Sequence, residues 1–161
     1  MTTTQQFLVL GGLILLSILA LNFFRASELQ YDLKYENEAI ITATSLAQSV
    51  IEEIGTKAFD EVTVDYKTDD VDSLTLENYF GPDSAETNRD LFDDIDDYDG
   101  YSFKDSSLGL GKFDVSVIIN YADRVKPDVL SINRTFCKRA TVIVDNSYLK
   151  FKTKFYYAFS Y

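Results

Sequence analysis

Histidine is absent from this 161-residue chain, which also has only one cysteine and two prolines. The missing histidine removes the commonest general base and metal ligand. The single cysteine, Cys137, excludes an intramolecular disulfide, and its strand-like surroundings are typical of a small core residue rather than a nucleophile. We therefore expect no enzymatic activity, no catalytic residue and no organic cofactor.

Proline is missing from the first 60 residues, and no glycine lies between Gly12 and Gly55. A mainly apolar run, residues 7–24, continues without a turn signal into a polar stretch. We expect one long helix that ends near residues 59–60 and measures on the order of 75 Å, at ~1.5 Å per residue. Half of it would need lipid or other apolar helices, and half a globular partner.

Three interpretations of residues 7–24 are open. A cleaved signal peptide is disfavoured, because residues 1–6 carry no cation and the run ends in Asn-Phe-Phe-Arg. A transmembrane helix fits marginally in length, but the first cation, Arg25, follows the run. The third interpretation is a helix that lies in the membrane before assembly and then packs with its copies in a filament core. It also explains why the helix continues past the bilayer.

The filament interpretation assigns the whole apolar run to the core. Gly11 and Gly12 would then allow close helix approach or local melting on assembly, although small residues are also common in membrane helices. The expected core residues are Phe7, Leu8, Leu10, Gly11, Gly12, Leu13, Leu15, Leu16, Ile18, Leu19, Leu21, Phe23 and Phe24.

After Arg25 the helical pattern becomes amphipathic. Apolar residues recur at spacings of three and four, which predicts a stripe that packs on a sheet. The stripe consists of Ile40, Ala43, Ala47, Val50, Ile51, Ile54 and Ala58, and the opposite face carries Glu38, Gln48, Glu52 and Glu53. Gly55 is either a weak point inside the helix or the start of its C-terminal cap region.

The charge is unevenly distributed. Residues 1–110 carry 6 Lys/Arg against 22 Asp/Glu, a net of −16, and residues 111–161 carry 9 Lys/Arg against 4 Asp, a net of +5. An acidic chain is a poor nucleic-acid binder, so we expect no nucleic-acid partner. The asymmetry could bind copies of the chain to each other, or it could be a solvated acidic surface beside a locally basic sheet.

Residues 60–110 form an acidic connector with Gly-Pro and Asp-rich turn signals. Five Asp lie between positions 93 and 99, and Asp94, Asp97 and Asp99 are candidate ligands for Ca²⁺, the one metal we consider. The string does not fit the EF-hand spacing, since Ile95 and Ser106 would occupy the two ends of the loop. The favoured interpretation is a turn in which Asp side chains cap backbone amides, with Phe92, Ile95 and Tyr98 facing inward.

Residues 111–161 show period-two alternation, which is typical of half-buried strands. We predict strands at 113–121, 134–145 and 149–159, with Asp145-Asn-Ser147 as a hairpin turn. In the second strand, Lys138 shares a face with apolar residues. An antiparallel meander with one face on the amphipathic helix follows, so the predicted fold class is α+β.

A lysine row, Lys150, Lys152 and Lys154, lies on the third predicted strand. It either protects a sheet edge against aggregation or contacts an acidic patch of a neighbouring subunit.

The predicted organisation is an apolar helix over residues 1–24 and a globular domain over 25–161. Within that domain we expect the helix at 25–59, the connector at 60–110 and the sheet at 111–161.

The order of long helix, acidic connector and antiparallel sheet resembles the type IV pilin superfamily, including minor pilins and the pseudopilins of type II secretion. Residues Thr44–Ile54 (TSLAQSVIEEI) are similar to the stretch of many prepilin-like proteins where the helix leaves the membrane. Residues Phe92–Tyr101 (FDDIDDYDGY) are similar to a string in mannose-sensitive-haemagglutinin-type minor pilins. The resemblance implies insertion in the inner membrane, a pilus assembly machinery as partner, and then a cell-surface filament of copies of the chain.

The chain also departs from that family. Members of that family usually have Glu at position five of the mature chain, where it is thought to neutralise the N-terminal amine of a neighbouring subunit. If Met1 is the mature terminus, this chain has Gln5 at that position. Met1 and Gln5 would then set the register without a charge pair. The basic leader, the helix proline and the paired-cysteine loop are missing too, so we expect either an already mature chain or different export, and leave N-terminal methylation open.

These expectations converge on a structural subunit of an extracellular pilus-like filament. Within the same class, a minor pilin or pseudopilin that primes assembly or secretion is the alternative. From another class, the alternative is a single-pass membrane protein with an extracytoplasmic ligand-binding domain.

Overall fold

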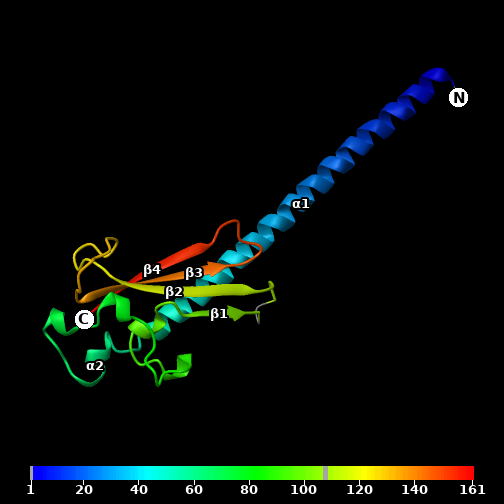
Figure 1. Ribbon diagram of the computed structural model, residues 1–161. Coiled ribbons are helices and arrows are strands. Elements are labelled where there is room, and N and C mark those ends of the chain that lie inside the picture. Colours follow the sequence, from blue (N-terminus) through cyan, green and yellow to red (C-terminus); the bar gives the residue numbers. More distant parts are fainter. Residues whose placement is uncertain (1, 107–108) are drawn as a thin grey trace. The chain divides into compact units, whose positions relative to one another are not determined.

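The computed structural model describes residues 2–106 and 109–161. It confirms the predicted α+β class: helix α1 (Thr3–Ile54) is followed by a four-stranded antiparallel sheet (Figure 1). The chain divides into two compact units, Met1–Glu38 and Ala39–Tyr161. The second unit begins where the buried stripe of α1 begins, at Ala39, whereas the predicted boundary after residue 24 marks the end of the apolar run.

In the first unit, α1 is regular through the apolar run. A Cβ atom added at Gly11 or Gly12 would meet nothing within 4 Å, so neither glycine is required by packing inside the described chain. Both glycines nevertheless keep the helical conformation, since the helix is continuous from Thr3 to Ile54.

In the second unit, α1 packs through a narrow stripe of mostly small residues. Every member is at most 2 % exposed: Ala39, Ala43, Ala47, Val50 and Ile54. The predicted stripe was correct from Ala43 to Ile54 but wrong at Ile40, which is 42 % exposed. Ala39, one residue earlier, takes the buried position.

The helix ends at Ile54, five residues before the predicted end. Gly55 follows it directly, and its N–H still donates to the Ile51 carbonyl. Ala58 then leaves the helical path because its backbone pairs with the connector: the Ala58 N–H donates to Asp93, and the Ala58 carbonyl accepts from Ile95. Gly55 therefore belongs to the end of the helix rather than its interior.

The sheet is a meander of β1 (Ser102–Asp105), β2 (Phe113–Tyr121), β3 (Cys137–Asp145) and β4 (Thr153–Ser160), in that order. Alternate residues of β2 are buried, as the period-two pattern predicts. The register places Val117 opposite Val142 and Val142 opposite Phe155, so the inward faces of β2, β3 and β4 are continuous. This face and the α1 stripe form one hydrophobic core.

Three details of the sheet differ from the prediction. Strand β1 was not predicted, because four residues that mix Ser, Phe, Lys and Asp carry little pattern. The second predicted strand begins three residues late, at Cys137. The third predicted strand begins four residues late, at Thr153. Asn146 is the reason: its side chain accepts from the Tyr148 N–H and its carbonyl accepts from the Leu149 N–H, which extends the turn beyond residue 147.

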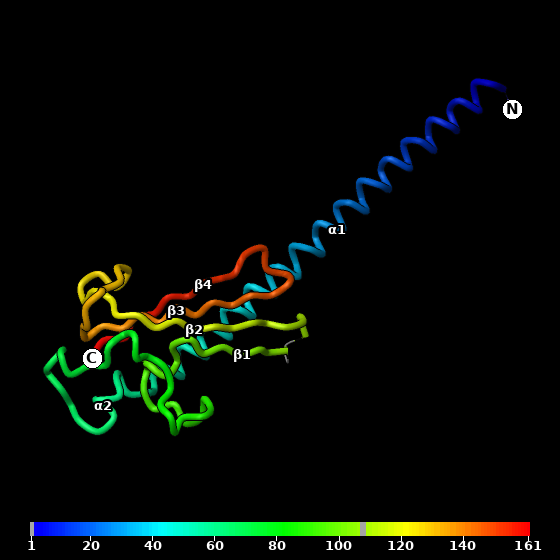
Figure 2. Tube along the Cα trace, in the orientation of Figure 1, coloured from blue at the N-terminus to red at the C-terminus, as the bar shows by residue number. Residues whose placement is uncertain are grey.

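Before β1, the connector is built from short helical turns and lies at the sheet end that carries the C-terminus (Figure 2). They are α2 (Glu61–Asp65), η1 (Val71–Ser73), η2 (Glu77–Tyr79), η3 (Arg89–Leu91) and η4 (Asp96–Tyr98). Gly81 and Gly100 have φ of 121° and 72°, which glycine adopts without strain, so these turn signals were correct.

Candidate functional site

The apolar segment of α1 exposes side chains on every side. The large predicted core residues, from Phe7 to Phe24, are between 50 and 75 % exposed. This is the one helix of the described chain that is long and apolar enough to cross a membrane, with a mean hydropathy of 2.5 over 18 residues. Such a surface requires lipid or other apolar helices around it.

The predicted register residues lie at the helix start. Gln5 accepts a hydrogen bond through Oε1 from the Thr2 N–H, at 3.2 Å, and so caps the first turn of its own helix. Met1 lies outside the described residues.

The three lysines of the predicted row do not share one strand. Lys154 lies in β4 opposite Ile143, while Lys150 and Lys152 precede that strand. Lys152 already forms an ion pair with Asp145 of its own chain at 3.4 Å. The prediction of a single lysine row on the third strand was therefore wrong, because β4 begins only at Thr153.

A charged cluster that the sequence did not predict lies inside the second unit, around Lys138 of β3. This lysine is fully buried. Its Nζ donates to Asp60 Oδ2 at 2.8 Å, to Asp96 Oδ2 at 2.7 Å and to the Phe59 carbonyl at 2.7 Å. The one signal in the sequence was the position of Lys138 on the apolar face of its strand.

Three aromatic rings enclose the Lys138 ammonium. Its Nζ lies 4.6 Å from the ring centroid of Phe59, 5.1 Å from that of Phe80 and 5.4 Å from that of Tyr121. Cations are attracted to ring faces at these distances. The rings also keep water away from the two carboxylates.

Asp60 is the more strongly hydrogen-bonded of those carboxylates. It is the N-cap of α2, where it accepts from the Val62 N–H, and it also accepts from the Thr75 N–H and hydroxyl and from the Tyr121 hydroxyl. Burial opposes its charge, but Lys138 and the hydrogen bonds outweigh burial and lower the pKa of Asp60. Asp60 therefore carries the negative charge of the cluster.

Asp96 and Asp94 have the opposite balance. Burial raises the pKa of Asp96 to about 8, although Lys138 opposes the shift. Burial likewise raises the pKa of Asp94 to about 6. The single buried ammonium of Lys138 therefore cannot neutralise three carboxylates at once. Protonation of Asp94 and Asp96 removes the excess negative charge.

The acidic string largely folds as a turn that caps its own amides, as predicted. Asp97 Oδ2 accepts from the Asp93 and Asp94 N–H groups, and Asp94 Oδ1 accepts from the Asp97 N–H. Asp99 instead accepts from Ile119 of β2 at 2.8 Å. The predicted inward residues Phe92, Ile95 and Tyr98 are at most 4 % exposed.

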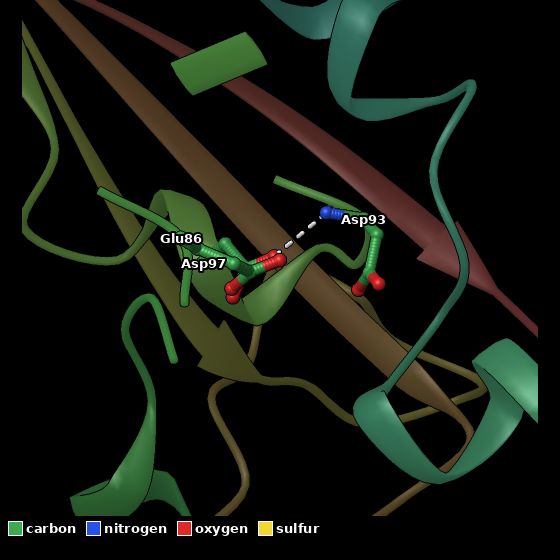
Figure 3. A group of neighbouring side chains, drawn as sticks. All are labelled: Glu86, Asp93 and Asp97. Atoms are coloured by element: carbon green, nitrogen blue, oxygen red, sulfur yellow. Dashed lines mark hydrogen bonds between the residues drawn. The ribbon is translucent and has the colours of Figure 1, made fainter. Parts of the chain in front are cut away.

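One group of carboxylates could face a cation. Glu86, Asp93 and Asp97 bring one oxygen each to within 4.8 Å of one another (Figure 3). Of the predicted calcium ligands Asp97 belongs to this group, and Asp94 and Asp99 do not. Three oxygens are fewer than the roughly six to eight that Ca²⁺ takes.

A second ion pair fixes the connector to α1. Arg89 of η3 donates through both Nε and Nη2 to the Glu53 carboxylate, and the Tyr98 hydroxyl donates to the same group at 2.8 Å. Burial opposes the charge of Glu53, but these donors outweigh it and lower its pKa. Glu53, which was expected on the face opposite the apolar stripe, is partly covered by Arg89.

A groove of about 560 Å³ separates the last turns of α1 from β4. Its walls include Ile51 and Gly55 on the helix and Phe155, Tyr157 and Phe159 on the strand. A Cβ at Gly55 would lie 3.3 Å from the Phe159 ring, so glycine permits this close approach.

Cys137 is 2 % exposed and burial raises its pKa, which fits the expected core role.

Comparison with known proteins gives no match to any protein-family model, curated protein or solved structure.

Proposed function

We propose that this protein is a structural subunit of an extracellular pilus-like filament, assembled by bundling of residues 7–24 from many copies. The observation that carries the proposal is the exposure of large apolar side chains all around this part of α1. A helix that is apolar on every side is stable only in lipid or among similar helices. The membrane would hold it before assembly, and the filament core afterwards.

Lipid alone accounts for less than half of the helix. α1 has 52 residues, or about 78 Å at ~1.5 Å per residue, against a bilayer core of about 30 Å. The exposed apolar surface continues past the apolar run, at Leu29 (64 %), Tyr31 (63 %), Leu33 (54 %) and Ile41 (66 %). Apolar residues on a helix outside the membrane favour protein neighbours, which a bundle of parallel copies provides.

Charge would then set the order of the subunits. Residues 1–110 carry a net of −16 and residues 111–161 a net of +5, so opposite regions of two copies attract. Lys154 on β4 is exposed and available for such a contact, whereas Lys152 is shared with Asp145. Gln5 offers hydrogen bonds at the helix start without a charge.

The test is a charge placed in the proposed core. Leu13→Asp and Leu16→Asp, made in the full chain, should abolish filaments in negative-stain micrographs, since a carboxylate in a waterless bundle is costly. Leu13→Ile and Leu16→Ile are the matched controls and should assemble. Near-ultraviolet circular dichroism should be the same for all four, because both sites lie outside the second unit. Filaments in either Asp variant would overturn the proposal.

One observation favours the other class of function. The groove between α1 and β4 is partly lined by aromatic rings, as ligand sites often are. A single-pass membrane protein that binds a ligand there would remain a monomer in detergent and form no filaments after detergent removal. A minor pilin or pseudopilin would instead enter filaments only together with another subunit.

A further inference from the structure

Lys138 and Asp96 are arranged for a reaction as well as for an ion pair. The Lys138 Nζ lies 2.7 Å from both carboxyl oxygens of Asp96. A nitrogen equally close to both oxygens faces the carbon that they share. The contact to Oδ1 lacks hydrogen-bond geometry, and within the described chain that oxygen is left without a donor. The amine therefore donates to Oδ2 and lies equally close to Oδ1, within reach of the carbon that bears both oxygens.

We propose that Lys138 and Asp96 condense into an intramolecular isopeptide bond that joins β3 to η4, with Asp60 as the proton carrier. The inference does not rest on filament assembly.

The hydrogen bonds around the two carboxyls assign their roles. Asp60 accepts from Val62, Thr75 and Tyr121 in addition to Lys138, so its negative charge is stabilised where it is. For the Asp96 carboxyl, Lys138 is the only donor seen among residues 2–106 and 109–161. Asp96 is thus the group that takes a proton and becomes the electrophile.

The reaction balances without any further reagent. A proton moves from the Lys138 ammonium to Asp96, and the free amine attacks the Asp96 Cγ to form the C–N bond. Asp60, whose Oδ2 is 2.8 Å from Nζ, takes a proton from that nitrogen and delivers it to a hydroxyl on Cγ. The C–O bond breaks and one water leaves. Asp60 is again a carboxylate, and the new amide N–H can donate to it.

The surroundings favour condensation over hydrolysis. Lys138 and Asp96 are 0 % and 3 % exposed, and the rings of Phe59, Phe80 and Tyr121 surround the nitrogen. A dry site removes the solvation that favours the two charged forms. Fixed contact between amine and carboxyl also replaces a bimolecular encounter and so removes its entropic cost.

The bond would provide an intramolecular covalent cross-link, which the cysteine content of this chain cannot provide. Cys137 is the single cysteine, so no intramolecular disulfide can form. The Lys138–Asp96 link spans 42 residues of sequence and ties the connector to a central strand of the sheet.

Mass spectrometry of the purified full chain tests the proposal. The intact mass should be about 18 Da, one water, below the value for the observed N-terminus, and a digest should yield a branched peptide joining Lys138 to Asp96. Lys138→Arg, which keeps the cation but not the nucleophile, should have the full mass. Asp60→Asn should be mainly unlinked. Lys152→Arg, at an exposed ion pair, should keep the deficit.

The wild-type result decides the matter whether or not a variant folds. Natively folded wild-type chain of full mass, with Lys138 and Asp96 in separate peptides, would overturn the proposal. A branched peptide joining Lys138 to Asp60 would overturn the assignment of the electrophile.

Discussion

Replacing Lys138 with methionine removes one buried charge and keeps most of the side-chain volume. It leaves Asp60 and Asp96, which are 0 % and 3 % exposed, without their cation. Removing one partner of a buried pair costs about 3–5 kcal/mol. Asp96 can take a proton, since its pKa is already raised to about 8, and Asp60 keeps its other donors. We therefore expect a loss of about 3 kcal/mol, to which loss of an isopeptide bond would add.

Urea unfolding of the full chain in detergent measures the loss, followed by tyrosine fluorescence because the chain has 11 Tyr and no Trp. Lys152→Met is the control: its ion pair with Asp145 is exposed and should contribute at most about 1 kcal/mol. The penalty of Lys138→Met should also shrink in acid, where the stranded carboxylates take protons. Equal, small losses in the two variants would refute the reasoning.

Three further outcomes follow from the same contacts. Glu53→Ala should cost about 2 kcal/mol in urea unfolding, because the Arg89 and Tyr98 donors lose their acceptor; a loss within error would contradict this. Ala43→Leu should cost about 1–3 kcal/mol, since Ala43 is 0 % exposed and added methyl groups overpack a buried contact; an unchanged or raised midpoint would speak against the tight stripe. Burial raises the pKa of Asp94 from 3.8 to about 6 and that of Asp97 to about 7. The folded state therefore keeps protons that the unfolded chain releases, and stability should fall as the pH rises from about 4 to about 7; a stability that rises over this range, from urea midpoints at several pH values, would show that the sign is wrong.

Local patterns predicted the elements that make local or repeated contacts. The spacing of Ala43, Ala47, Val50 and Ile54 predicted the packed side of α1, and alternation predicted β2 at its observed bounds. The alternation of 149–159 overran the strand start, because it cannot reveal that Asn146 prolongs the turn.

The charged cluster was beyond such patterns because its partners are far apart in sequence. Lys138 meets Asp60 and Asp96 over separations of 78 and 42 residues, and Glu53 meets Arg89 over 36. Helical or strand periodicity assigns each residue to a face but does not say which distant side chain covers it. The path of the connector, fixed by the bridge between Ala58 and Asp94, decides those partners.

Negative-stain electron microscopy of the wild-type chain, purified in detergent and then freed of it, tests the central claim most directly. The exposed apolar surface from Phe7 to Phe24 predicts filaments of uniform width. A chain that is monomeric in detergent and forms no filaments after the detergent is removed would contradict the proposed function.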